Sequence, residues 1–294
     1  MTARTPADSR RTEARTSPFP PILVTGGTGT LGRQVIARLT ARGLRARALS
    51  RHPGDDTDLV EYCTGDLDTG AGVGAAVKGV LLVIHCAGAR VGDDRKAATL
   101  VAAARPAGVQ HLVNISVVGA DRVPVKSSID RAMFGYFASK LAAEAVIAGS
   151  GIPWTTLRAT QFHELVLITA RAMAKLPVVP VPAARFQPVA GAEVAERLVE
   201  LALGEPAGLA PDIAGPRIYP MRDLVRSYVQ ARGLHRVLLP MRMPGAAARA
   251  VRAGANLAPE SATGRETWEA FLAAQDLGGV RRQVTPSSAG AATG

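Results

Sequence analysis

The sequence predicts an α/β protein, with a doubly wound parallel sheet and a smaller, mostly helical C-terminal cap. Three observations support this class: apolar runs alternate with segments of helical spacing, a glycine-rich turn follows the first apolar run, and the run VLLVIHC at residues 80–86 is almost wholly apolar. A sheet that helices cover on both faces needs such strands, because neither face meets water.

The elements follow one another in a strand, helix, strand order. We expect strands at 22–25, 46–50, 80–86, 111–116 and 154–158, a further short strand before Gly65, and helices at 31–42, 93–105 and 131–149. This order implies parallel strands that are joined by helical crossovers.

The 294 residues suit one large domain with a smaller annex. Residues 1–20 and 285–294 offer little to bury, so we expect a disordered leader and a disordered tail. The core is expected over 21–160. Residues 161–284 are expected to form a substrate cap that is interleaved with the core, with helices at 191–203, 221–232 and 264–275.

Composition argues against several classes of protein. The net charge is +11, which raises the question of nucleic-acid binding. The sequence lacks the features that would support it, because it has no run of five basic residues and no aromatic residues interleaved with basic ones. No stretch reaches the roughly 18 apolar residues of a membrane helix, and the N-terminus lacks a signal-peptide core. Cys63 and Cys86 lie in apolar segments and indicate buried thiols. We therefore expect a cytoplasmic protein.

The segment TGGTGTLG at residues 25–32 predicts a dinucleotide site. Gly26, Gly29 and Gly32 follow a strand and open a helix, which is the context that gives this spacing its meaning. Backbone N–H groups at such a helix start can bind a pyrophosphate, and the expected loop contacts also include Thr28, Thr30, Leu31 and Arg33. The alternative is a glycine-rich turn that binds nothing.

The end of the second strand favours NADP over NAD. A site for NAD places an acidic residue there to bind the ribose, whereas this chain has Ser50 and Arg51. Arg51, together with Arg33, could bind a 2′-phosphate. The alternative is that both are ordinary surface arginines. The remaining cofactor candidates follow the next strands: Asp66, Leu67, Ala87 and Gly88.

Tyr136 and Lys140 lie four residues apart in the motif YFASK and so share one face of a helix. A lysine cation beside a phenol favours the phenolate, which lowers the pKa of the tyrosine and makes it usable as an acid or base. Ser116, at the end of the fifth strand, could hold a substrate oxygen. The alternative is a surface pair with an unrelated serine.

Together, TGGTGTLG, Ser50-Arg51, the Asp66 turn, HCAG, HLVNIS, YFASK and IPWTTLRATQF resemble the short-chain dehydrogenase/reductase superfamily, and they are most similar to its atypical NmrA-like NAD(P)H-binding branch. The resemblance spans about residues 21–275. It implies a Rossmann-type fold, pyrophosphate binding by the glycine loop, a proton-donating Tyr136, a ribose-anchoring Lys140 that also binds cofactor, and a substrate-orienting Ser116. Homodimers are common in that superfamily.

The resemblance implies an NADP-dependent oxidoreductase that transfers hydride to a small carbonyl, quinone or enone. One alternative is a non-catalytic NADP(H)-sensing regulator, because the segment RKAATLVAAA lacks the asparagine of many superfamily enzymes. A second is an NAD-dependent epimerase or dehydratase, against which the missing acid after the second strand argues.

The substrate candidates are Phe134, Phe162 and His163, with Met133 and Phe186 as further apolar residues near the cap. No metal site is expected, since the segment QFHELVL has leucine where a zinc helix of the H-E-x-x-H type needs its second histidine. We therefore expect a small-molecule substrate as the partner.

Overall fold

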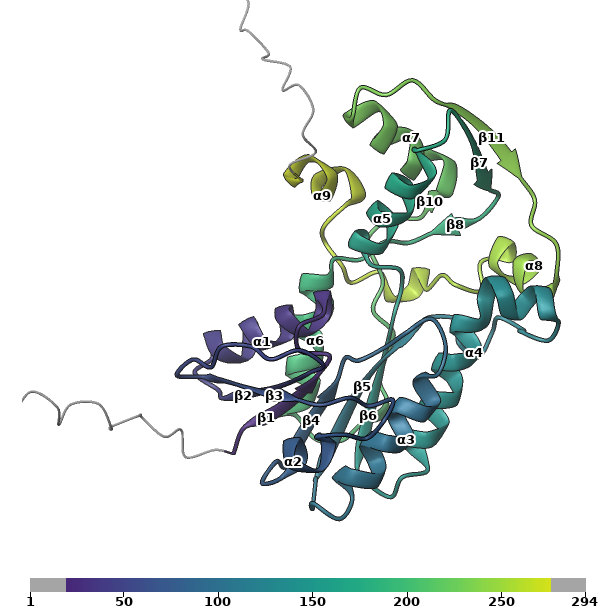
Figure 1. Cartoon of the computed structure of the whole chain (residues 1–294). Helices are drawn as coiled ribbons and strands as arrows, with labels where there is room; N and C mark the ends of the chain where they lie inside the picture. The colour runs from purple at the N-terminus through teal and green to yellow at the C-terminus, as the bar shows by residue number, and fades with distance from the viewer. Residues whose placement is uncertain (1–19, 276–294) are drawn as a thin grey trace, which may run out of the picture.

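A computed structural model describes residues 20–275. Its centre is a seven-stranded sheet of order β3-β2-β1-β4-β5-β6-β9 with parallel pairing throughout (Figure 1). The strands are β1 (Ile22–Thr25), β2 (Ala46–Ser50), β3 (Val60–Thr64), β4 (Leu82–His85), β5 (His111–Val117), β6 (Trp154–Ala159) and β9 (Gly208–Leu209). The predicted Rossmann-type fold is confirmed. The predicted leader, apart from Pro20, and the predicted tail lie outside the described residues.

Helices cover both faces of this sheet, as the continuous apolar strands predict. The helices are α1 (Thr30–Ala41) and α6 (Gly191–Leu203) on one face, and α2 (Val73–Val77), α3 (Asp93–Ala104) and α4 (Ser128–Ala148) on the other (Figure 1). Successive residues of a strand point to opposite faces. Val24 accordingly packs in the cluster of α1 and α6, whereas Leu23 packs in the cluster of α2, α3 and α4.

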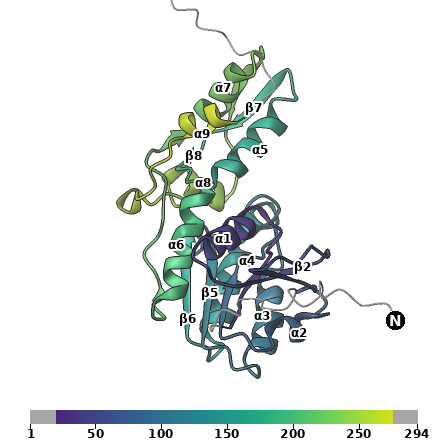
Figure 2. The same ribbon diagram turned by 90° about the vertical axis from the view of Figure 1, so that its left-hand side faces the viewer.

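The cap stands over the sheet edge at which the parallel strands end (Figure 2). It comprises α5 (His163–Met173), β7 (Val178–Pro182), β8 (Arg185–Phe186), β10 (Tyr219–Pro220), α7 (Met221–Ala231), β11 (Val237–Met241), α8 (Ala246–Ala253), a 3-10 turn (Pro259–Ser261) and α9 (Trp268–Ala274). The chain enters the cap with α5, returns to the core for α6 and β9, and then enters the cap again.

The cap contains strands that the sequence analysis missed. β7 pairs with β11 in parallel, and β8 pairs with β10 in an antiparallel ladder. β7 reads VVPVP, and prolines lower the expectation of a strand because they cannot donate to a ladder. A two-stranded sheet consists only of edges, so its strands tolerate proline where a central strand would not.

Candidate functional site

The site residues gather where the parallel strands end. Gly26 follows β1, Ser50 ends β2, Asp66 follows β3, Gly88 follows β4 and Ser116 lies near the end of β5. In an open α/β sheet, ligands bind outside this edge where the strand order reverses. Here the reversal lies between β1 and β4, which are hydrogen-bonded neighbours.

The glycine loop is packed so closely that side chains would not fit. A Cβ at Gly32 would lie 2.1 Å from the carbonyl oxygen of Gly26, and a Cβ at Gly26 would lie 2.9 Å from Cα of Ala87. Gly26 also has a φ of 65°, in the left-handed region that glycine favours. These contacts bring the start of α1 against the end of β4, as a pyrophosphate cradle requires.

The end of β2 is tied to this loop. Thr28 Oγ1 lies 3.0 Å from Ser50 Oγ, and the backbone N–H of His52 donates to the same Ser50 oxygen at 3.2 Å. Arg51 lines the adjacent cavity, whereas the guanidinium of Arg33 donates back to the carbonyl of Thr28. Of the two predicted phosphate-binding arginines, the structure therefore places only Arg51 at the cavity.

This first cavity has a volume of about 330 Å³. The cofactor-binding residues expected from the sequence that line it are Gly26, Thr28, Gly29, Ser50, Arg51, Asp66, Leu67, Ala87 and Gly88. Thr30, Gly32 and Arg33 line neither this cavity nor the one beside it. The sequence analysis missed Lys96 and Asp68, which line the cavity and form an ion pair of 2.6 Å. Asp66 Oδ1 accepts the backbone N–H of Asp68 at 2.9 Å, as a turn residue does.

A second cavity, of about 640 Å³, lies beside the first and shares Cys86, Gly88 and Ala89 with it. Ser116, Tyr136 and Lys140 all line it, together with Leu31 and apolar residues of core and cap. Its four phenylalanines are Phe134, Phe137, Phe162 and Phe186. Met133 is not among its lining residues.

Tyr136 and Lys140 meet in this cavity. Lys140 Nζ lies 5.8 Å from the centroid of the Tyr136 ring and 3.0 Å from Oδ2 of Asp93, with which it forms a buried ion pair. Burial raises the pKa of Tyr136, Lys140 opposes this change, and Asp93 adds to it. The expectation of a lowered pKa for this tyrosine is therefore wrong, because burial and the carboxylate outweigh the ammonium.

Two histidines near the site have structural surroundings. Nδ1 of His85 lies 2.7 Å from Thr25 Oγ1, and burial, with a smaller contribution from Lys140, lowers the pKa of His85 to about 4. His163, predicted to contact substrate, does not line the cavity. It is fully buried in the cap core, where its ring stacks on Phe271 at 4.9 Å between centroids and also against Trp268.

Two buried oxygen atoms of cavity-lining residues, Ser116 Oγ and Asn256 Oδ1, have no hydrogen-bond partner in the described part of the chain. The Asn256 amide orientation follows from its Nδ2, which donates to the carbonyl of Arg185 at 2.8 Å. Unpaired buried polar atoms are costly, which is why they are common where a ligand supplies the partner. The sequence analysis missed Asn256, because it reaches the site from a loop about 140 residues after Ser116.

Residues 26–201 match the model of a protein family described as NAD(P)H-binding. This chain belongs to that NAD(P)H-binding family. The matched segment contains the glycine loop, Ser116, Tyr136 and Lys140, so both cavities contain residues from it.

Among curated proteins, the chain is 32% identical over 147 residues to a (4-alkanoyl-5-oxo-2,5-dihydrofuran-3-yl)methyl phosphate reductase of Streptomyces griseus. That alignment covers 48% of each protein, so the chain spans about half the length of this relative.

Two solved structures share the fold. An NADPH-dependent quinone oxidoreductase from Escherichia coli, complexed with NADPH, has a TM-score of 0.70 at 19% identity and covers 86% of this chain and 98% of its own. A triphenylmethane reductase from Citrobacter sp., complexed with NADP(H), has a TM-score of 0.68 at 20% identity over 87% of this chain and 100% of its own. The fold is thus shared along the whole length of these neighbours.

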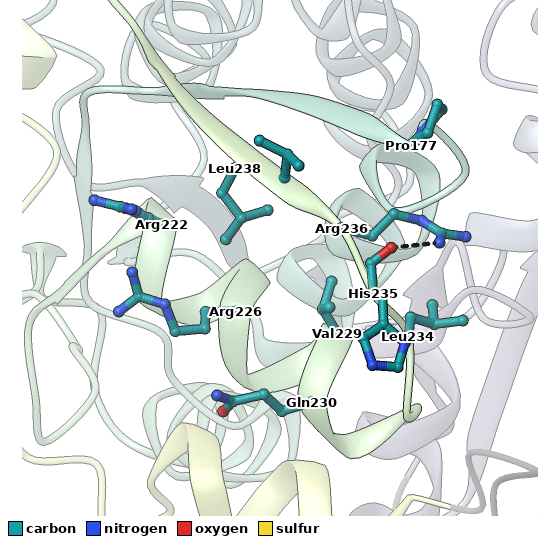
Figure 3. Close-up of a pocket in the computed structure, with 10 residues that line it drawn as sticks. Pro177, Arg222, Arg226, Val229, Gln230, Leu234, His235, Arg236 and Leu238 are labelled. Carbon is teal, nitrogen blue, oxygen red and sulfur yellow. Dashed lines mark hydrogen bonds between the residues drawn. The ribbon is translucent and has the colours of Figure 1, made fainter.

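A third cavity, of about 500 Å³, lies within the cap between α7 and β11 (Figure 3). Its cationic side chains do not converge: Arg222 and Arg226 lie on one side, and Arg236 on the other (Figure 3). Arg226 pairs with Asp223 at 3.2 Å, and Arg236 donates to the carbonyl of Ala174 at 2.8 Å. We therefore assign the functional site to the two cavities at the sheet edge.

Over residues 20–275, no group of three or more His, Cys, Asp or Glu side chains is arranged to hold a metal ion. None of the helices in this range is long and apolar enough to cross a membrane.

Proposed function

We propose that this NAD(P)H-binding protein is an NADPH-dependent oxidoreductase of the atypical, NmrA-like short-chain dehydrogenase type, which reduces a small carbonyl, quinone or enone. The observation that carries the proposal is that Ser116, Tyr136 and Lys140 all line one apolar cavity, which adjoins the glycine-loop cavity at Gly88. The names of the reductase relative and of the two structural neighbours agree with this class.

The residues at the first cavity fit a dinucleotide. The loop glycines have no side chains that would cover the backbone, and no side chain caps the start of α1, so a pyrophosphate can approach the backbone there. The loop from Gly26 to Gly32 would hold the pyrophosphate, Arg51 the 2′-phosphate and Lys140 a ribose hydroxyl. A bound NADPH supplies the hydride. The volume of the second cavity, about 640 Å³, suits a small organic substrate next to it.

The chain's own groups supply the proton and the orientation. Ser116 Oγ, which has no partner among the described residues, is free to donate to a substrate oxygen. The Tyr136 hydroxyl would donate its proton to that oxygen as the substrate is reduced, and after product release a proton from the solvent would restore the phenol. The four phenylalanines exclude water from the reacting atoms and offer flat surfaces for an aromatic or conjugated substrate.

Replacing the proton donor tests the reaction. Tyr136→Phe should lower NADPH oxidation with a panel of carbonyls, quinones and enones by about a hundredfold or more, since general acid catalysis contributes at least this much. NADPH affinity, measured by fluorescence titration, should remain. The control is Tyr219→Phe, which removes a cap hydroxyl that donates to Glu269. Equal turnover by wild type and Tyr136→Phe would remove Tyr136 from the mechanism.

Cofactor preference has its own test. Arg51 is the predicted phosphate-binding arginine that lines the first cavity, so Arg51→Asp should weaken NADPH binding and favour NADH. Calorimetric titration of both coenzymes measures the ratio. Arg33→Asp serves as the comparison, because Arg33 does not line the cavity. An unchanged ratio in Arg51→Asp would contradict NADP selection by this residue.

A second candidate is a regulator that binds NADP(H) without turnover. Lys140 is held by Asp93, and no asparagine in α3 completes the superfamily's proton relay. Tight NADPH binding without oxidation of NADPH by any compound of the panel would favour this candidate over the reductase.

A further inference from the structure

We propose that Asp93 is a positioning residue, which holds the Lys140 ammonium and balances its charge, so that Tyr136 remains a protonated phenol and the site favours reduction over oxidation. The inference rests on the proposed function, because it concerns the proton donor of that reaction. Asp93 was not among the residues that sequence analysis selected, and it opens α3, one helix away from the Tyr136-Lys140 pair of α4.

The ion pair is short and shielded from water. Lys140 Nζ lies 3.0 Å from Asp93 Oδ2, and the two side chains are only 8% and 1% exposed. A buried charge needs a partner, and removal of one member leaves the other uncompensated. The negative charge of Asp93 therefore allows Lys140 to remain a cation although it is buried.

Asp93 is itself held in place. Its Oδ1 accepts the backbone N–H of Ala89 at 2.7 Å, and its own N–H donates to Ser139 Oγ at 3.0 Å. It also occupies the first turn of α3, where the helix dipole favours a negative charge. These contacts hold the carboxylate beside Ala89, which lines both cavities.

Lys140 is fixed from the other side as well. Its Nζ donates to the carbonyl of Ile115 at 3.4 Å, and a Cβ at Gly88 would lie 3.0 Å from the same nitrogen. An ammonium has three N–H groups. One donates to Ile115, and the ammonium as a whole forms the ion pair with Asp93. The ammonium therefore keeps N–H groups that can bind a ligand hydroxyl in the cavity that Lys140 lines.

The charge balance acts on the phenol. A lone ammonium beside Tyr136 would stabilise the phenolate, whereas the Asp93-Lys140 pair has no net charge. Burial raises the pKa of Tyr136, with Lys140 opposing and Asp93 adding to the change. A phenol with a raised pKa donates a proton over a wide pH range, but it does not serve as the base that oxidation of an alcohol would need.

Other ionisable groups surround the pair. These are His85 and Cys86 at the end of β4, Arg90 in the following loop and Lys96 on α3. Burial lowers the pKa of His85 to about 4 and raises that of Cys86 to about 12, so both are neutral near pH 7. Arg90 donates to the carbonyl of Ala132, and Lys96 pairs with Asp68 at 2.6 Å. Asp93 is therefore the carboxylate that compensates Lys140.

The test is a tyrosinate titration of the full chain without cofactor or substrate. The chain has four tyrosines, so ultraviolet titrations of wild type and Asp93→Asn are each repeated with Tyr136→Phe, and the difference is the Tyr136 signal. Asp93→Asn should lower the pKa of Tyr136 by about one unit or more. Asp94→Asn is the matched control, since it removes the same charge from the next residue and should leave the value unchanged.

A second variant keeps the test decisive if Asp93→Asn does not fold. Lys140→Gln leaves Asp93 unbalanced and should raise the pKa of Tyr136 further. A value that is unchanged or raised in Asp93→Asn, or unchanged in Lys140→Gln, would overturn the inference. Because the titration needs no turnover, it distinguishes this inference from the reductase proposal. If both hold, the alkaline limit of NADPH-dependent reduction moves to lower pH in Asp93→Asn by the same shift.

Discussion

At the scale of single residues, the glycine loop depends on the absence of side chains, because a methyl group in place of a hydrogen atom would prevent the close approach of its backbone. A Cβ at Gly32 would lie 2.1 Å from the Gly26 carbonyl oxygen, which is backbone and cannot turn aside. Gly32→Ala should therefore displace the loop and weaken NADPH binding by about tenfold or more, a change of about 1.4 kcal/mol. Isothermal calorimetry measures it.

Gly74→Ala is the control for that variant, because it lies in α2 and its added Cβ would meet nothing within 4 Å. Equal NADPH affinity of Gly32→Ala and wild type would show that the close approach of α1 is not needed for binding.

Local spacing was enough to select Gly26, Tyr136 and Lys140, since each lies in a short motif with its own mechanism. It could not select Asp93 or Asn256, because only the tertiary fold brings them to the site. The direction of the Tyr136 pKa failed for the same reason. The neighbour four residues away was visible in the sequence, whereas burial and the carboxylate from α3 were not.

At the scale of elements, α4 carries the reactive pair, and its start is set by a capping box. Ser127 Oγ accepts the N–H of Asp130, whose carboxylate accepts the N–H of Ser127. This box explains why the helix begins at Ser128 rather than at the predicted residue 131. Apolar spacing marks where a helix is buried, and the start of α4, where Ser128 and Ile129 are exposed, carries no such signal.

Loss of this cap should destabilise the protein without removing a site residue. Ser127→Ala should lower the free energy of unfolding by about 1 kcal/mol, as is typical for an N-cap serine, and urea unfolding measures the change. Ser128→Ala is the control, because its exposed side chain does not cap the helix. If the two variants were equally stable, the capping box would not contribute to the free energy of unfolding.

The core elements could be predicted because burial on one or both sides gives their sequences a regular spacing of apolar residues. The helix predicted at 191–203, for example, coincides with α6. The cap was less predictable. α9 begins at Trp268 rather than residue 264, and β7 and β11 were missed because their prolines resemble loop signals. The cap strands are therefore set by their pairing with each other, which no local window contains.

At the scale of the whole molecule, three buried histidines connect stability to pH. They lie in β4, in β5 and at the start of α5, as His85, His111 and His163. Burial lowers the pKa of each, to about 4 for His85. The unfolded chain therefore binds protons below about pH 6.5 that the folded chain does not bind, so the free energy of unfolding falls as pH falls from there towards about 4.

The measurement is the urea midpoint of unfolding at a series of pH values in this window. His85→Gln should make the urea midpoint depend less on pH, because the variant lacks one group whose protonation favours unfolding. This holds even if the variant is less stable than wild type at neutral pH. His235→Gln removes an exposed cap histidine and serves as the control. If both variants kept the wild-type slope, His85 would not be the source. His85 ends β4 and is followed by Cys86, which lines both cavities, so this titration acts on the strand edge where the two cavities meet.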